Sequence, residues 1–129
     1  MSAPSPDEIH SLFASGLNAG HVDAVADLFE EHAILVSDPN RIVRGRDAIR
    51  EGLVNFLTIG PKLTLNASRV VRNGDIALLY SDWTIKGIHP DGQAFSTEIR
   101  PTHVVRRQAD GTWRIVIDDP SANEPADSH

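Results

Sequence analysis

The sequence contains no cysteine. Disulfide bridges, thiolate metal sites and a cysteine nucleophile are therefore excluded. No apolar run approaches the roughly 18 residues that a membrane-spanning helix needs. The opening residues, Met-Ser-Ala-Pro-Ser-Pro, have neither the basic segment nor the apolar segment of a signal peptide. We therefore expect a cytoplasmic protein that does not contact a membrane.

Positive charge is also scarce, and the common cofactor motifs are missing. The chain has 12 Lys and Arg against 18 Asp and Glu, whereas a nucleic-acid surface needs a basic stripe. The histidines show no His-x-x-x-His or His-Glu-x-x-His spacing. There is no Gly-x-Gly-x-x-Gly, no phosphate loop and no Gly-x-Ser-x-Gly elbow. We expect no nucleic acid, no metal and no cofactor.

The first half of the chain has a helical period. Ser5 followed by Glu8 has capping-box spacing and predicts a helix that ends near Gly20. A second helix is predicted over 22–29, then a short strand over 33–36, a turn over 37–40 and a strand fragment at 42–43. A third helix is predicted between Gly45 and Gly60. The apolar positions at helical intervals are Ile9, Leu12, Phe13, Leu17, Val22, Val25, Leu28, Phe29, Ile49, Leu53, Phe56 and Leu57.

After Pro61 the period changes to two. Strands are predicted over 63–72, 76–88, 94–107 and 112–118, separated by Asn-Gly and Asp-Gly turns. This pattern predicts one α+β domain over 1–129, with a core at about 6–120 and a flexible polar tail at 121–129. Such long strands coil, so a curved antiparallel sheet packed with three N-terminal helices should form a cone with an internal cavity.

The outer face of this sheet would expose Val, Thr and Trp side chains. We therefore expect a homodimer that forms through this face.

His103 and Asp118 lie on the last two predicted strands, on either side of the turn at Asp110-Gly111. Residues about equally far from a hairpin turn are neighbours, so the two side chains should meet. A carboxylate beside an imidazole is either a proton-transfer pair or a buried structural pair. Asp119 is the alternative to Asp118, because a one-residue slip reverses which side chain faces inward.

Four segments of the chain form a familiar set: Leu-Asn-Ala-Gly-His-Val-Asp-Ala-Val-Ala-Asp-Leu-Phe, the Ser-Asp-Pro loop, Gly-Arg-Asp-Ala-Ile-Arg and Trp-Arg-Ile-Val. Together they resemble the nuclear transport factor 2-like superfamily, nearest to its SnoaL-like and ketosteroid-isomerase-like bacterial proteins. The resemblance covers the chain from about Pro6 to Pro120. It is specific for a cystatin-like fold and weak for the reaction, since this fold hosts isomerases, cyclases, hydratases, hydrolases and binding modules.

Compared with ketosteroid isomerases, the resemblance places Asp38, in Asp38-Pro39, at the position of the general base. Phe13 stands where those enzymes have an oxyanion-hole tyrosine, and His103 stands where they have a protonated aspartate. A phenyl ring cannot donate a hydrogen bond to an enolate, so the familiar steroid isomerisation is not expected. Asp38 also sits in a typical turn sequence, where its carboxylate would bind local backbone amides.

Compared with SnoaL-like polyketide cyclases, the resemblance implies that Asp118 is the acid/base and that His103 lines the same cavity. The expected substrate contacts are Phe13, Phe29, Phe56, Ser81 and Trp83. One hypothesis is a cofactor-independent isomerase- or cyclase-type enzyme that transfers protons on a small hydrophobic carbonyl compound. The alternative is a non-catalytic ligand-binding or dimerisation module.

Overall fold

The computed structural model describes residues 3–38 and 41–120, without the side chain of Asp38. Its helices are α1 (Glu8–Asn18), α2 (Val22–Ala26) and α3 (Arg46–Leu57). Its strands are β1 (Phe29–Asp38), β2 (Arg41–Arg44), β3 (Lys62–Asn73), β4 (Ile76–Ile88), β5 (Ala94–Ile99), β6 (Thr102–Arg107) and β7 (Trp113–Asp119). The predicted α+β class is confirmed, and the predicted tail lies outside the described residues.

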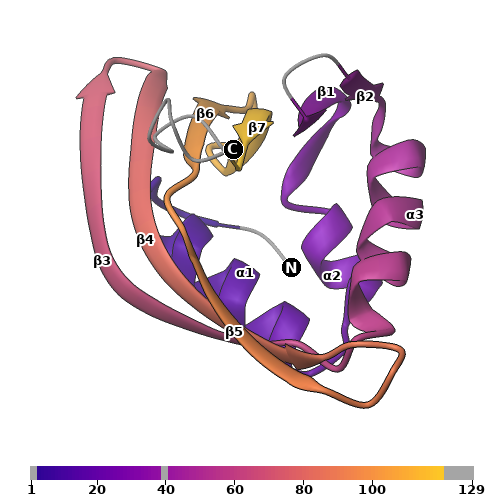
Figure 1. Cartoon of the computed structure of the whole chain (residues 1–129). Coiled ribbons are helices and arrows are strands. Elements are labelled where there is room, and N and C mark those ends of the chain that lie inside the picture. Colours follow the sequence, from indigo (N-terminus) through magenta and orange to yellow (C-terminus); the bar gives the residue numbers. More distant parts are fainter. Residues whose placement is uncertain (1–2, 39–40, 121–129) are drawn as a thin grey trace.

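Within the described residues, the strands form one curved, unclosed sheet of seven strands (Figure 1). Its order is β2-β1-β7-β6-β4-β3, and β5 also pairs with β4. The predicted antiparallel meander from β3 to β7 is confirmed. A parallel pairing of β1 with β7 joins the N-terminal part of the chain to this meander.

Two predicted boundaries are wrong. The second helix ends at Ala26 rather than at Phe29, because the backbone amide of Ile115 donates to the Leu28 carbonyl and draws this segment into the sheet. The strand predicted over 94–107 is divided into β5 and β6 at Pro101, which has no amide hydrogen to donate to a ladder. Ser5 does not cap α1 with its side chain either, since the N-cap residue is Asp7 and no side-chain cap bond forms there.

The core lies on the concave face of the sheet. In Figure 1, α1 crosses the inside of the curve formed by β3 and β4, while α3 stands on the opposite side of the molecule. On β4, Ala77, Leu79, Trp83 and Ile85 are buried at alternate positions, as the period of two predicts. These apolar side chains make the sheet face on which the cavity is built.

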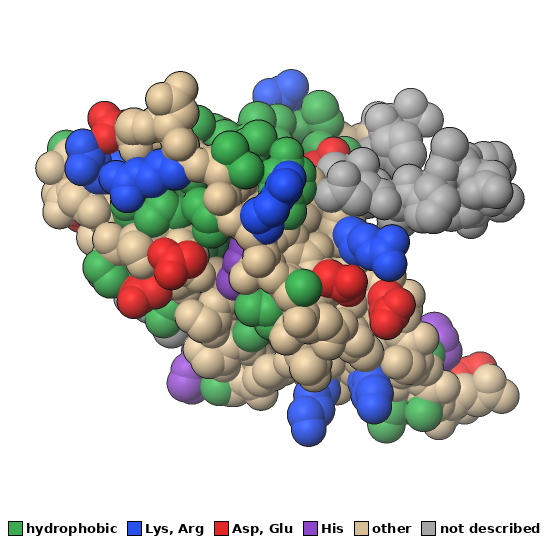
Figure 2. Space-filling model, turned by 90° about the vertical axis from the view of Figure 1, so that its left-hand side faces the viewer, with side chains coloured by type: hydrophobic (Ala, Val, Ile, Leu, Met, Phe, Trp, Pro, Cys, Tyr) green, Lys and Arg blue, Asp and Glu red, His purple; other side chains and the backbone are tan. Residues whose placement is uncertain are grey.

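The convex face carries an apolar row that runs straight across five strands. The paired residues in this row are Val71, Leu78, Val104, Ile117 and Ile34. All are at least partly exposed, and Figure 2 shows hydrophobic side chains beside Lys and Arg on the side of the molecule formed by β3 and β4. The expectation that tryptophan would be exposed here is wrong, because Trp83 and Trp113 are both buried.

Within the described residues, no helix has the length and apolar character needed to cross a membrane.

Candidate active site

A cavity of about 660 Å³ lies between α1, α3 and the concave face of the sheet. Most of its wall is apolar, from Phe13, Leu17, Phe29, Leu35, Val43, Ile49, Leu53, Phe56, Leu63, Trp83, Ile85 and Ile99. Polar side chains enter the wall at Ser37, Arg41, Glu51, Asn55, His103 and Asp118. A large apolar pocket with a few polar groups is the usual form of a small-molecule site.

The pairing of His103 with Asp118 depends on the turn and on a bulge. At the turn, the Asp110 carboxylate accepts the backbone amide of Thr112 at 2.9 Å, and Gly111 adopts a positive φ of 85°. The register then shifts between Val104 and Val105, because β7 contains one extra residue. Without this bulge, counting from the turn would place His103 opposite Ile117 and turn Asp118 to the convex face.

His103 and Asp118 form a buried pair on the cavity wall. The distance from His103 Nε2 to Asp118 Oδ1 is 3.1 Å, and the two side chains are only 5% and 8% exposed. Asp119 pairs with Thr102 on the opposite face and is not part of the wall, so Asp118 is the inward carboxylate. In such surroundings each charge is stabilised chiefly by the other, since water is largely excluded.

Two rings of α1 pack against the His103 imidazole. The centroids of Phe13 and His10 are each 5.9 Å from its centroid, and the two residues are three positions apart on the helix. His10 also contacts the edge of Trp83. Burial lowers the pKa of His10 from 6.5 to about 4, with a further contribution from the nearby His103, and Asp7 opposes this shift.

The sequence prediction did not include His10 in the site. The signal was present, because His10 has the helical spacing of Phe13 and Leu17 and therefore faces the core.

The structure brings together most of the predicted substrate contacts. Phe13, Phe29, Phe56 and Trp83 line the cavity. Ser81, which was predicted beside them, is not among the residues that line the cavity. Its hydroxyl accepts the indole N–H of Trp83 at 2.8 Å, which fixes the orientation of the tryptophan instead.

Asp38, the second candidate base, ends β1, and its backbone pairs with Arg41. Its side chain lies outside the described residues, so the structure does not place the carboxylate. The neighbouring Ser37 belongs to the cavity wall.

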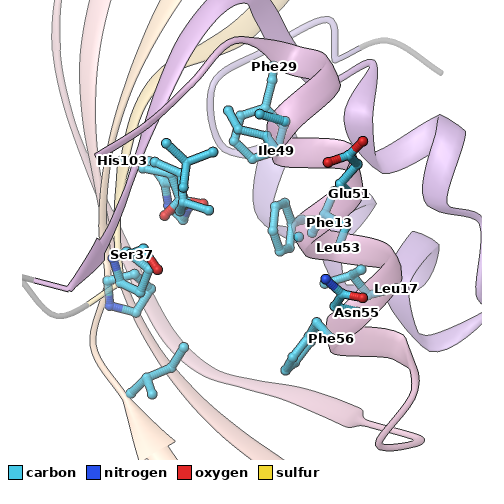
Figure 3. A pocket seen from close by; sticks show the side chains of 18 of the residues that line it. Phe13, Leu17, Phe29, Ser37, Ile49, Glu51, Leu53, Asn55, Phe56 and His103 are labelled. Atoms are coloured by element: carbon cyan, nitrogen blue, oxygen red, sulfur yellow. The ribbon is translucent and has the colours of Figure 1, made fainter. Parts of the chain in front are cut away.

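Four polar wall residues were not predicted: Ser37, Arg41, Glu51 and Asn55. Figure 3 shows Glu51 and Asn55 on the side of the cavity opposite His103 and Ser37. On α3 they lie three or four positions from the wall residues Ala48, Gly52 and Phe56, so they share one face of the helix with them. That spacing was visible in the sequence, but polar residues on a helix are more often solvent-facing.

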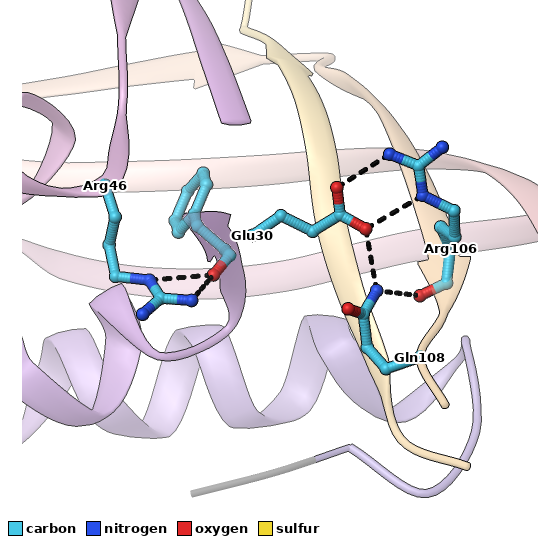
Figure 4. Close-up of polar contacts among 5 residues, drawn as sticks. Glu30, Arg46, Arg106 and Gln108 are labelled. Atoms are coloured by element: carbon cyan, nitrogen blue, oxygen red, sulfur yellow. Dashed lines mark hydrogen bonds and ion pairs between the residues drawn. The ribbon is translucent and has the colours of Figure 1, made fainter. Parts of the chain in front are cut away.

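Hydrogen bonds and an ion pair connect β1, near Phe29, to α3 and β6 (Figure 4). The guanidinium of Arg46 donates twice to the Phe29 carbonyl, at 3.0 and 2.8 Å, and so holds the start of α3 against β1. Next along β1, Glu30 accepts two hydrogen bonds from Arg106 and one from Gln108. Arg106 holds the pKa of Glu30 below its usual value, so the carboxylate stays charged. These contacts fix β1 relative to α3 and β6.

No group of three or more histidine, aspartate or glutamate side chains placed to hold a metal ion occurs in the part of the chain that the structure describes.

A curved, unclosed sheet with helices around an internal cavity defines the class of cystatin-like, nuclear transport factor 2-like proteins. Solved structures of this class match the fold closely. A ketosteroid isomerase-like protein from Erwinia carotovora atroseptica has a TM-score of 0.80 at 15% identity, covering 92% of this chain and 94% of that one. A nuclear transport factor 2-like superfamily protein from Salmonella enterica has a TM-score of 0.78 at 20% identity, covering 95% and 92%.

A third match is a nuclear transport factor 2-like protein with a cystatin-like fold from Novosphingobium aromaticivorans, with a TM-score of 0.75. It is 19% identical and covers 92% of this chain and 80% of that one. At these identities the likeness concerns the fold alone. No curated protein matches the sequence significantly.

Within this class, the chain belongs to the SnoaL-like family. The model of the SnoaL-like domain matches residues 9–116, which is most of the chain.

Proposed function

We propose that this protein is a cofactor-independent enzyme that transfers protons on a small hydrophobic carbonyl compound, as an isomerase or a cyclase does. The observation that supports this function best is the buried His103–Asp118 pair on the wall of an apolar cavity. The likeness to a ketosteroid isomerase-like protein agrees with it, although that likeness concerns only the fold.

In the proposed reaction, the Asp118 carboxylate removes a proton from the carbon next to the substrate carbonyl. The electron pair of the C–H bond forms a C=C bond, and the π pair of the carbonyl moves to its oxygen to give an enolate. Once Asp118 has taken up the proton and lost its charge, Nε2–H of protonated His103 turns from Asp118 to donate a hydrogen bond to that oxygen, and Asp118 then returns the proton to carbon. A positioned acid/base of this kind contributes about 100- to 10,000-fold to a rate.

The cavity limits the size of the substrate. A space of about 660 Å³ is within the range of about 300–1,000 Å³ that is usual for small-molecule sites. Phe13, Phe29 and Trp83 favour an apolar ring system. Arg41, Glu51 and Asn55 supply hydrogen-bonding groups on the wall for a polar substituent.

The test measures exchange of α-protons for deuterium in D₂O with a panel of bicyclic ketones such as 1-indanone and 1-tetralone. Exchange should be catalysed by the unaltered protein and should fall at least 100-fold in Asp118→Asn and in His103→Gln. Asp119→Asn is the matched control, because it removes the neighbouring carboxylate on the opposite face. Equal rates for Asp118→Asn, His103→Gln and the unaltered protein would refute the proposal.

A second candidate is a non-catalytic binding module, and Phe13 is the observation that favours it. Its ring packs against His103, and the side chain has no hydrogen-bond donor for an enolate. This candidate predicts that hydrophobic ketones bind, measured by calorimetry, while exchange in D₂O stays at the uncatalysed rate.

We also propose that the apolar row on the convex face is covered by a second copy of this chain. Leu78 lies on β4, within that row, between Val71 and Val104. Leu78→Arg should convert a dimer to a monomer in size-exclusion chromatography with light scattering, without loss of fold. Ser11→Arg, on the exposed side of α1, is the control. A monomeric unaltered protein would contradict the proposal.

A further inference from the structure

His10 is the least explained polar group in the core. His10 is only 1% exposed, and neither nitrogen of its ring has a hydrogen-bond partner among the described residues. Unpaired buried polar groups are rare in folded proteins, since each leaves its desolvation uncompensated. A leucine at this position would fill similar space without that penalty. We therefore infer that the imidazole of His10 does something that an apolar side chain cannot do.

A third unpaired nitrogen lies next to this ring. Nδ1 of His103 is buried and has no partner in the described part of the chain, whereas Nε2 faces Asp118. When His103 is protonated, both ring nitrogens carry a hydrogen, and Nδ1–H then needs an acceptor. The centroids of the His10 and His103 rings are 5.9 Å apart and their planes are inclined by 61°, and His10 has a ring nitrogen with a free lone pair.

For His10 to accept a hydrogen bond, its ring must be uncharged. The pKa of His10 is lowered to about 4 by burial and by His103, so the ring is neutral at physiological pH. The ionisable groups around it are Asp7 at the N-cap of α1, His103 on β6 and, beyond His103, Asp118 on β7. On the β4 side it meets the indole of Trp83, which does not ionise in this range.

We propose that neutral His10 accepts a hydrogen bond from Nδ1 of protonated His103, and that His10, His103 and Asp118 act as one relay in which only the middle ring carries positive charge. His10 is then a positioning residue behind the acid–base pair. It stabilises the protonated form of His103 and keeps Nε2 directed at Asp118. Its importance for turnover rests on the proposed function, but the hydrogen bond itself does not.

The test follows the ring nitrogens by NMR in protein labelled with ¹⁵N-histidine, with no substrate present. In the unaltered protein, His10 should be neutral at pH 6, and the Nδ1 hydrogen of protonated His103 should appear far downfield. In His10→Leu, the pH midpoint for protonation of His103 should fall by about one unit, a tenfold loss of proton affinity. His10→Asn and His10→Gln place an amide oxygen near the positions of the two ring nitrogens, and at least one should restore the midpoint.

Phe13→Leu is the matched control. Phe13 contacts the His103 ring at the same centroid separation as His10 but offers no acceptor, so its removal should change packing and leave the midpoint in place. An unchanged midpoint in His10→Leu overturns the proposal, and so does an equal shift in Phe13→Leu. If His10→Leu does not fold, the downfield hydrogen in the unaltered protein decides, and its absence is contrary evidence. Because no turnover is measured, this result is independent of whether the protein proves to be an enzyme.

Discussion

Acidification should destabilise this protein through His10. Its pKa is about 4 in the folded chain and 6.5 in an ordinary environment, so between these values the unfolded chain binds a proton that the folded chain does not. Stability therefore rises with pH in this window. The contribution of the neutral ring is complete above pH 6.5 and is lost as the pH falls toward 4.

The size of the effect follows from the same two values. The full difference of about 2.5 units corresponds to about 3 kcal/mol at ~1.4 kcal/mol per unit. At pH 5, about 1.5 units below the ordinary value, the loss is about 2 kcal/mol. For a chain of this length, that loss lowers the melting temperature by about 8 °C.

Urea unfolding at pH 8 and pH 5 measures this loss, with His10→Leu as the comparison. The variant has no ring to protonate, so its free energy of unfolding should fall by about 2 kcal/mol less than that of the unaltered protein. Groups remote from His10 contribute equally to both proteins and cancel. The contribution of His103 does not cancel, and it is subtracted with the protonation midpoint of His103 measured by NMR in each protein. Equal losses in the two proteins would show that His10 is not held neutral by the fold.

Two further predictions concern the frame of the cavity. Gly16→Ala should destabilise the protein by about 1–3 kcal/mol in thermal unfolding, because the new Cβ would lie 2.5 Å from Cγ2 of Val25. Gly52→Ala is the control and should be neutral or stabilising, because its Cβ would have nothing within 4 Å. If Gly52→Ala were the more destabilising of the two, the packing at Gly16 would be contradicted. Glu30→Gln should cost about 0.5–1 kcal/mol near pH 7, since Arg106 is partly exposed. The difference should begin to shrink below the usual pKa of a glutamate and vanish below the lowered pKa of Glu30, where Glu30 itself becomes protonated. A difference that persists at still lower pH would assign the effect to packing.

Much of the fold could be read from local patterns. The alternation of apolar residues on β4 and the Asn-Gly and Asp-Gly turns were sufficient for the meander. The apolar spacing of α1 and α3 was sufficient for two of the helices. The end of α2 was misplaced because Leu28 continues a helical pattern, while its carbonyl is taken by a strand far away in the sequence.

The candidate site was predicted only in part. Aromatic residues at core positions, such as Phe13 and Trp83, could be assigned to the wall because burial follows from their period. Ser81 has the same period as Trp83, and only the structure shows that its hydroxyl is already used by the indole. Glu51 and Asn55 were missed because both are exposed, as their polarity predicts, and only the structure places them at the cavity.

The sequence by itself determined that an imidazole and a carboxylate stand on one hairpin, since the turn at Asp110 and Gly111 is encoded locally. The tertiary structure decided which carboxylate faces the imidazole. One extra residue in β7 shifts the register by one position, and because side chains alternate between faces, that shift brings Asp118 inward and leaves Asp119 outward. It also decided that His10, 93 positions before His103 in the sequence, lies against the same ring, because α1 packs into the curve of the sheet.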